Sequence, residues 1–347
     1  MKCGFITVPR VLLRRRSPAS WLVILGLVLV LLIEPTVRIR SRFSVARPPL
    51  ERDIPFATSC KEPDVSAPRE DAVIVMLVRN KELKQATHSI NQLEQAFNKW
   101  FHYPVVFLNN DAWTDEFISG MRSVVSGDAI FEVLPNGTWG FPDPLEYMTS
   151  DKSFDGSFSF DIDAARKSME YQGAHGVNRG AMESYHHMCR FFSGPFFDLP
   201  VLSAYRYYWR VEPGVDFLCQ ITYDPFREMR LNDKVYGWAM AQWESPLTVP
   251  TLFRVTADYM AREGISETPL WRTILQPEWQ SIPLRLWRAA YDGVRDAYGD
   301  KWSLCHYWSN FEIADLDFFR GPEYMKYYRH LLAHGGFYNE RASKSLS

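Results

Sequence analysis

The run 71-DAVIVMLVRN-80 decides how the rest of the chain is interpreted. Residues 72–78 are apolar without interruption, which is the pattern of a strand covered on both faces, as in a parallel sheet. Arg79 and Asn80 follow directly and therefore stand at the carboxyl end of the predicted strand. Because open parallel sheets bind ligands at that end of their strands, Arg79 is placed at the edge of a binding site.

Similar signals recur downstream. Residues 81–100 carry apolar side chains at helical spacing, and strand-like runs follow at 103–108 (YPVVFL), 129–134 (AIFEVL) and 205–211 (YRYYWRV). Strands and helices that alternate with short connections favour an α/β domain with a mainly parallel sheet. The chain has neither a G-x-G-x-x-G nor a G-K-[ST] signature, which argues against a dinucleotide fold or a P-loop enzyme.

Composition narrows the function classes. The chain has 347 residues, 46% of them hydrophobic, which is enough to form a full hydrophobic core. Its formal net charge of −2 argues against nucleic acid as a partner. Five cysteines occur without a C-x-x-C pair, which argues against a zinc site. Cys60, Cys189, Cys219 and Cys305 are open to two interpretations, disulfides in an exported protein or free thiols.

The N-terminal region predicts membrane attachment. A basic segment, residues 1–16, precedes an apolar run, and residues 17–33 are just long enough to cross a thin bilayer. No small-x-small cleavage site follows, so an uncleaved anchor with a cytosolic N-terminus is preferred over a cleaved signal peptide. Residues 34–70 are rich in Pro, Arg and Ser and predict a stem, which leaves 71–347 as a lumenal domain.

Two glutamates stand out. Glu212 follows the run 205–211 and precedes Pro213, which cannot continue a ladder, so Glu212 is predicted at a strand terminus. It could serve a site or merely pair with Arg210 or Arg206. Glu312 lies between Phe311 and Ile313 in a mostly apolar run. A carboxylate that is buried there is costly to keep and often functional, whereas the alternative is a solvated Glu312 on a surface strand. The periodicity of the run does not distinguish the two.

Several longer runs resemble one known family. The segments YHHMCRFFSGPFF, YYWRVEPGV, TVPTLF and, above all, CHYWSNFEIADLDFFR are similar to the fungal Golgi α-1,2-mannosyltransferases of glycosyltransferase family 15. The resemblance extends over about Asp71–Arg341. It implies a type II membrane protein of the Golgi with a lumenal GT-A-like nucleotide-sugar transferase domain, which moves mannose from GDP-mannose to mannoside or glycoprotein acceptors with retention and depends on Mn2+.

Carried over by motif, the resemblance assigns roles to particular residues. Glu312 matches the carboxylate proposed as nucleophile or as stabiliser of the oxocarbenium-like state, and Tyr185 and Glu212 match other active-site positions. Glu244, ahead of TVPTL, matches a metal-ligating glutamate. We expect Arg79 and Arg210 to contact the diphosphate of the donor, since guanidinium groups match its geometry.

The resemblance also has departures. Residues after TVPTLF up to Lys301 match the family poorly, and after Arg341 the chain lacks the family's Trp-Gly-Asp-Ala-Pro-Val-His run and a later metal-ligating histidine. The chain is therefore interpreted as C-terminally truncated, and we expect transfer to be weak or absent while GDP-mannose binding is partly kept. The alternative is a non-catalytic Golgi relative that binds GDP-mannose or glycans.

Overall fold

The computed structural model describes Leu22 and residues 25–29, 63–142, 160–275 and 302–342. Leu22 and residues 25–29 are helical, and their leucine and valine side chains are exposed. In these described segments, no helix has both the length and the apolar character that spanning a bilayer requires. Most of the predicted anchor at 17–33 and most of the predicted stem at 34–70 lie outside the described residues, and both stay predictions.

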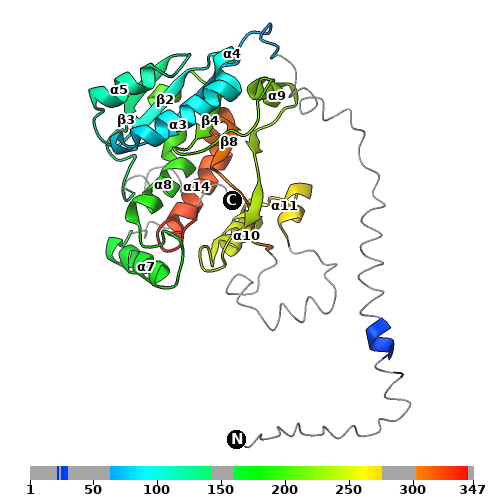
Figure 1. The fold of residues 1–347 in the computed structure, drawn as a ribbon. Helices are drawn as coiled ribbons and strands as arrows, with labels where there is room; N and C mark the ends of the chain where they lie inside the picture. Colours follow the sequence, from blue (N-terminus) through cyan, green and yellow to red (C-terminus); the bar gives the residue numbers. More distant parts are fainter. Residues whose placement is uncertain (1–21, 23–24, 30–62, 143–159, 276–301, 343–347) are drawn as a thin grey trace, which may run out of the picture. The chain divides into compact units, whose positions relative to one another are not determined.

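A six-stranded sheet with the order β3-β2-β1-β4-β8-β5 organises residues 63–342 (Figure 1). In chain order its strands are β1 (Ala72–Leu77), β2 (Val105–Asn109), β3 (Ala129–Val133), β4 (Tyr207–Val211), β5 (Tyr236–Trp238) and β8 (Phe311–Asp315). β1 pairs in parallel with β2 and β4, and β2 pairs in parallel with β3. β8 runs antiparallel between β4 and β5. The predicted α/β class with a mainly parallel sheet is confirmed; β8 runs against the other strands of the sheet and lies next to its edge strand β5.

The strands predicted at 72–78, 103–108, 129–134 and 205–211 correspond to β1–β4. The helix predicted over 81–100 is interrupted: α3 (Leu83–Leu93) passes into a π-helical turn (Glu94–Asn98) and the short α4 (Lys99–Phe101). Asn98 explains the interruption, because its side chain accepts from the Tyr103 backbone N–H at 2.8 Å and donates to Glu94 Oε1 at 2.9 Å. The polar side chain thus fixes the turn into β2.

The helices cover the sheet on both faces. They are α3, α4, α5 (Asp115–Arg122), α7 (Ile162–Ala174), α8 (Glu183–Ser193), α9 (Pro225–Leu231), α10 (Leu252–Glu263), α11 (Pro269–Ile274), α13 (Leu316–Arg320) and α14 (Pro322–Ala333). Alternate residues of β1 enter different cores: Ile74 and Met76 pack with side chains of α3, α5 and α9, whereas Val73 and Val75 pack with side chains of α8 and α13. The uninterrupted apolar run at 72–78 reflects this burial on both sides.

A third apolar cluster joins α7, α10 and α14 to the C-terminal segment around Phe337 and Tyr338. Beside it lies a two-stranded antiparallel sheet of β6 (Ala241–Trp243) and β7 (Cys305–Tyr307). This small sheet brings together two segments that lie about 60 residues apart in the sequence, and it carries part of the candidate site.

Candidate active site

The strand register places the polar residues of β4, β5 and β8 on one face of the sheet. Arg210 and Trp238 both lie opposite Glu312, and Tyr208 and Tyr236 both lie opposite Ala314. Because opposed residues and every second residue share a face, Tyr208, Arg210, Glu312 and Tyr236 point to the same side. Tyr208 and Ala314 belong to the core that packs against α8, so this is the face beneath α8.

Glu312 is completely buried, with 0% of the residue exposed. The Tyr208 hydroxyl donates to Oε1 at 3.1 Å, and the Tyr236 hydroxyl donates to Oε2 at 3.0 Å. Burial and the charge of Glu312 raise the pKa of both tyrosines far above their ordinary value, so each hydroxyl keeps its proton and remains a donor. Of the two environments that the sequence left open for Glu312, the structure shows the buried one.

Arg210 links Glu312 to Glu212. Its Nη1 lies 3.9 Å from Glu312 Oε1, and its Nε donates to Glu212 Oε1 at 2.6 Å. The guanidinium carbon lies 3.6 Å from the centroid of the Phe192 ring on α8. Burial opposes the charge on Arg210, but Glu212 and Glu312 outweigh it and hold the pKa of the guanidinium above its ordinary value. Arg210 thus lies between two carboxylates, one buried and one partly exposed. We call Glu312, Arg210 and Glu212, together with Tyr208 and Tyr236, the Glu312 cluster.

Glu212 follows β4 directly, at the strand terminus where the sequence placed it. Its side chain is 23% exposed, whereas that of Glu312 is not exposed at all. The two carboxylates thus share Arg210 but differ in access, and Glu212 is the one that reaches solvent.

Tyr185 on α8 lies close to two guanidinium groups. The guanidinium carbons of Arg179 and Arg341 lie 5.2 Å and 5.3 Å from its ring centroid. Burial raises the pKa of the Tyr185 hydroxyl, which keeps it protonated. Arg341 also pairs with Glu244, with Nη2 3.2 Å from Oε2. Arg341 therefore contacts two predicted site residues, Tyr185 and Glu244. Arg341 was not among the residues selected from the sequence. The signal that could have indicated it is its place at the end of the region that resembles the family.

Glu244 follows β6, and its backbone N–H donates to the Leu304 carbonyl at 2.8 Å. His306 on β7 lies opposite Gln242 and is 9% exposed. Burial lowers the pKa of His306, while the nearby charge of Glu244 acts in the opposite direction. We call Glu244, His306 and Arg341 the Glu244 cluster.

Cys189 shows that the two clusters are neighbours. The charges of Arg341, Arg210, Glu244 and Glu212 all act on its thiol, and burial raises the pKa of that thiol to about 11. Cys189, Cys219 and Cys305 are free, and Cys60 lies outside the described residues. The free-thiol interpretation therefore applies to the three cysteines that are described.

Arg79 lies apart from both clusters. It follows β1 at the same edge of the sheet from which Glu212 emerges, as predicted, but its side chain is 53% exposed and pairs with Glu82 at 2.7 Å. The pair closes a capping box at the start of the next helical turn. The structure thus gives Arg79 a local role, and its contact with a phosphate stays a prediction.

The donors near Glu244 suit a divalent cation. Across the described segments, no group of three or more His, Cys, Asp and Glu side chains forms a metal cluster. A carboxylate and an imidazole, as in Glu244 and His306, are nevertheless ligands that Mn2+ accepts, and a bound diphosphate supplies further oxygens. The residues therefore fit a cation that the protein and a nucleotide would hold together.

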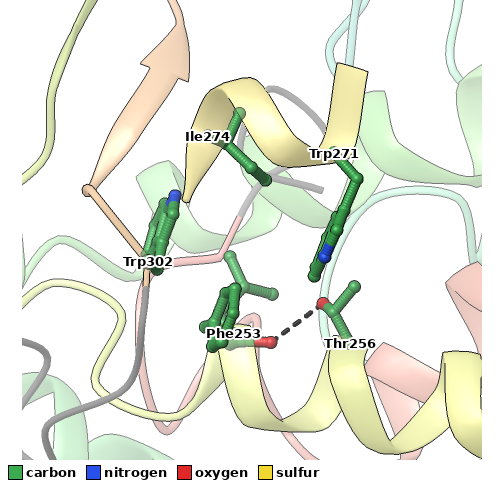
Figure 2. A pocket seen from close by; sticks show the side chains of 6 residues that line it. Phe253, Thr256, Trp271, Ile274 and Trp302 are labelled. Atoms are coloured by element: carbon green, nitrogen blue, oxygen red, sulfur yellow. Dashed lines mark hydrogen bonds between the residues drawn. The ribbon is translucent and has the colours of Figure 1, made fainter. Parts of the chain in front are cut away.

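A separate small pocket lies between α10 and α11 (Figure 2). Its lining consists of Leu252, Phe253, Thr256, Trp271, Ile274 and Trp302. The Phe253 ring stacks on Trp271, with centroids 5.4 Å apart, and is nearly parallel to Trp302 at 6.3 Å. The Thr256 hydroxyl already donates to the Leu252 carbonyl at 2.9 Å. The pocket is mostly apolar and shares no residue with the two clusters, so its lining contributes no polar group to the candidate site.

Comparisons with known proteins identify the family of this chain. Residues 44–346 match the family model of glycolipid 2-alpha-mannosyltransferase. The chain is 35% identical to O-glycoside alpha-1,2-mannosyltransferase homolog 4 of Schizosaccharomyces pombe, over 98% of this chain and 80% of that protein. It is 36% identical to the probable mannosyltransferase KTR4 of Saccharomyces cerevisiae, over 80% of this chain but only 55% of that protein.

Solved structures give the same result. Core-mannan synthase A from Aspergillus fumigatus in its Mn/GDP form aligns with a TM-score of 0.66 at 31% identity, covering 83% of this chain and 72% of that one. Ktr4p from S. cerevisiae in complex with GDP aligns with a TM-score of 0.65 at 34% identity, covering 82% and 69%. The extent of the family match and the identity to these relatives show that the chain belongs to the glycolipid 2-alpha-mannosyltransferase family, a family of glycosyltransferases.

Proposed function

We propose that this chain transfers mannose from GDP-mannose to a mannosylated glycoprotein acceptor, forming an α-1,2 linkage with retention of configuration. One relative named above is an O-glycoside alpha-1,2-mannosyltransferase homolog and another is a probable mannosyltransferase. One related structure holds GDP, and another is a Mn/GDP form. The observation that carries the proposal is the Glu312 cluster, because it collects three predicted site residues in one buried network.

The geometry supports one of the two roles expected for Glu312. Glycosyl transfer passes through an oxocarbenium-like state that carries positive charge. A carboxylate that accepts two hydroxyl donors and faces Arg210 is held in place as a negative charge, whereas attack on carbon would require it to leave those donors. We therefore assign Glu312 to electrostatic stabilisation of the transition state, and assign substrate contact to the more exposed Glu212.

The cationic side chains suit the donor's diphosphate. Arg179 and Arg341 lie within 5.3 Å of the Tyr185 ring centroid. The charge of Arg210 also acts on the neutral Tyr185 hydroxyl, so three guanidinium groups lie around it. Guanidinium groups bind phosphate oxygens through paired donors, which orients the donor and disfavours its free rotation. Mn2+, when bound through Glu244, would offset the charge that develops on the departing diphosphate.

The cellular placement is part of the same proposal. We place the chain in the Golgi membrane as a single-pass type II protein, anchored by residues 17–33 with the transferase domain in the lumen. Asn136 begins an N-x-Thr sequon and is exposed, so it can report lumenal exposure. A glycosidase-sensitive shift in mass that disappears in Asn136→Gln is expected; an unglycosylated protein accessible to protease from the cytosolic side of intact vesicles would contradict the placement.

The activity is tested with the purified full chain in detergent. Labelled GDP-mannose and methyl α-mannoside are incubated with and without MnCl2, and the product is analysed for linkage and anomeric configuration by NMR. We expect an α-1,2-linked disaccharide that forms only with the metal. If nothing turns over and GDP-mannose binds equally well with and without Mn2+, the chain is a binding protein and the proposal fails.

A further inference from the structure

The Glu244 cluster contains two buried polar atoms without a hydrogen-bond partner. They are Nδ1 of His306 and Nε of Arg341. Arg341 pairs through its Nη2 with the predicted metal ligand Glu244, and His306 lies on the strand beside Glu244. Nearly all buried polar groups in folded proteins are satisfied by protein, by ordered water or by an ion, and an unsatisfied group calls for an explanation. Two such atoms around one carboxylate indicate that a component of this cluster comes from outside the protein.

The small sheet sets the geometry of His306 relative to Glu244. The register of β6 and β7 pairs Gln242 with His306, and the Glu244 N–H continues the ladder by donating to the Leu304 carbonyl. Gln242 and Glu244 are two residues apart along the strand, so Glu244 lies on the face that carries Gln242 and its partner His306. Glu244 and His306 are thus diagonal neighbours on one face, a separation that long side chains bridge.

Glu244 has lone pairs left for a cation. Its Oε1 accepts from the Ser245 backbone N–H at 2.8 Å, and its Oε2 accepts from Arg341. A carboxylate has about four acceptor positions, so two contacts leave room for a metal bond. We propose that His306, through Nδ1, is a second protein ligand of the divalent cation that Glu244 binds.

Arg341 then has a defined part in metal binding. In the absence of a metal, its guanidinium balances the charge of the partly buried Glu244, whose side chain is 14% exposed. A divalent cation between Glu244 and His306 would supply that charge instead, and Arg341 would become free to meet a phosphate oxygen of the nucleotide. Metal binding and release of Arg341 are therefore coupled, so Arg341 acts as a competitor for the metal when no nucleotide is present.

This inference rests on the proposed function for its choice of metal, but its test does not depend on turnover. Mn2+ is paramagnetic, and electron spin echo envelope modulation detects a directly coordinated imidazole nitrogen. The purified full chain is loaded with MnCl2, with and without GDP, and modulation from 14N is recorded. Growth with 15N-labelled histidine changes the modulation frequencies if the ligand is histidine, which requires no substitution.

Three variants complete the test. His306→Gln is expected to abolish the nitrogen modulation and to weaken Mn2+ binding by at least ~10-fold, measured by titration against the free Mn2+ signal. The matched control is His88→Gln, because His88 on α3 is 50% exposed and pairs with Asp216 away from the cluster. Arg341→Gln is expected to tighten binding of Mn2+ alone, since the competing cation is removed.

The outcomes separate this inference from the function. Nitrogen modulation that is absent from the wild type, or that survives in His306→Gln, overturns the assignment of His306 even if mannose is transferred. Conversely, a His306-dependent signal in a chain that transfers nothing would leave the metal site standing and remove the proposed activity. If His306→Gln does not fold, tighter Mn2+ binding in Arg341→Gln together with the 15N shift supports the site, and an unchanged affinity in that variant contradicts it.

Discussion

The two polar clusters differ in how completely their hydrogen bonds are made. In the Glu312 cluster both carboxylate oxygens accept from tyrosine hydroxyls, and no member leaves a buried side-chain N or O unpartnered in the described structure. In the Glu244 cluster, His306 and Arg341 each leave one such atom. A completed network holds a charge in a fixed place, whereas an incomplete one has a site for an incoming group. The contrast matches the roles proposed above, in which the first cluster stabilises the transition state and the second binds a metal ion.

The largest expected effect comes from removing the charge of the completed network. In Glu312→Gln we expect kcat to fall by about 100- to 1000-fold, because one preorganised charge at the reacting centre contributes roughly 2.7–4 kcal/mol. Initial rates with GDP-mannose measure this. Asp317→Asn is the control, since Asp317 lies on the same segment with a side chain that is 67% exposed. Retention of a tenth or more of the wild-type rate in Glu312→Gln would contradict the contrast.

A smaller loss is expected when one donor of that network is removed. Tyr236→Phe deletes the hydroxyl that donates to Glu312 Oε2 at 3.0 Å and leaves a buried acceptor with one partner fewer. We expect a loss of about 1–3 kcal/mol in unfolding free energy and a lower kcat with little change in KM. Tyr171→Phe, at a tyrosine that is 60% exposed, is the control. Equal denaturation midpoints for the two variants would mean that the hydrogen bond is not part of the fixed network.

A fall in pH from 7.5 to 6 should lower the stability of the fold through histidines outside the Glu312 cluster, because that cluster contains no histidine. His186 and His187 on α8 are buried, and burial lowers the pKa of each below its ordinary value of 6.5. The unfolded chain therefore binds more protons than the folded chain as the pH falls through about 6.5, and stability is lost in that direction. We expect a lower Tm at pH 6 than at pH 7.5, by roughly 2–4 °C for each kcal/mol. A Tm that is constant or higher at pH 6 contradicts this sign.

The smallest effect concerns the loop after Glu212. Ser89 on α3 holds this loop from both sides: its hydroxyl accepts from the Val215 N–H at 2.8 Å and donates to the Val215 carbonyl at 3.2 Å. Ser89→Ala should cost about 1 kcal/mol of stability and raise KM for GDP-mannose a few-fold with kcat nearly unchanged. Thr87→Ala is matched, because the Thr87 hydroxyl bonds only within α3, to the Leu83 carbonyl. Identical KM values for both variants would show that the hydrogen bonds between Ser89 and Val215 do not position Glu212.

Local patterns were sufficient for the first four strands. Each is a short run of mostly apolar or aromatic residues, and the runs of β1, β2 and β4 are buried, which is the pattern that predicts a strand without reference to distant residues. The break at Glu94–Asn98 could not be predicted, because it depends on hydrogen bonds from Asn98 to Tyr103 that form only when the next loop is in place. Periodicity describes a helix face and does not reveal where a side chain will compete with the ladder.

The site was predictable in its residues but not in its pairings. Glu212 was placed at a strand end by Pro213, and Glu312 was singled out by its apolar neighbours, yet nothing local showed that Arg210 joins them. That contact follows from the register of β4 against β8, which lies about 100 residues away in the chain. The proximity of Glu244 to His306 has the same origin in β6 and β7. Arg79 illustrates the reverse: its place at the sheet edge was predictable, but its pairing with Glu82 was not.

The position of β8 has a consequence for how the protein is made. β8 lies inside the sheet, between β4 and β5, and β5 has no other neighbour in it. During synthesis, β1–β4 can pair as soon as they emerge, but β5 must wait until residues 311–315 arrive. The edge of β4 is exposed for that interval and can pair with other chains. A ribosome-bound chain that stops before Phe311 would therefore have the core of the fold without its charge network, and acquisition of the Glu312 cluster would be the last step of sheet assembly.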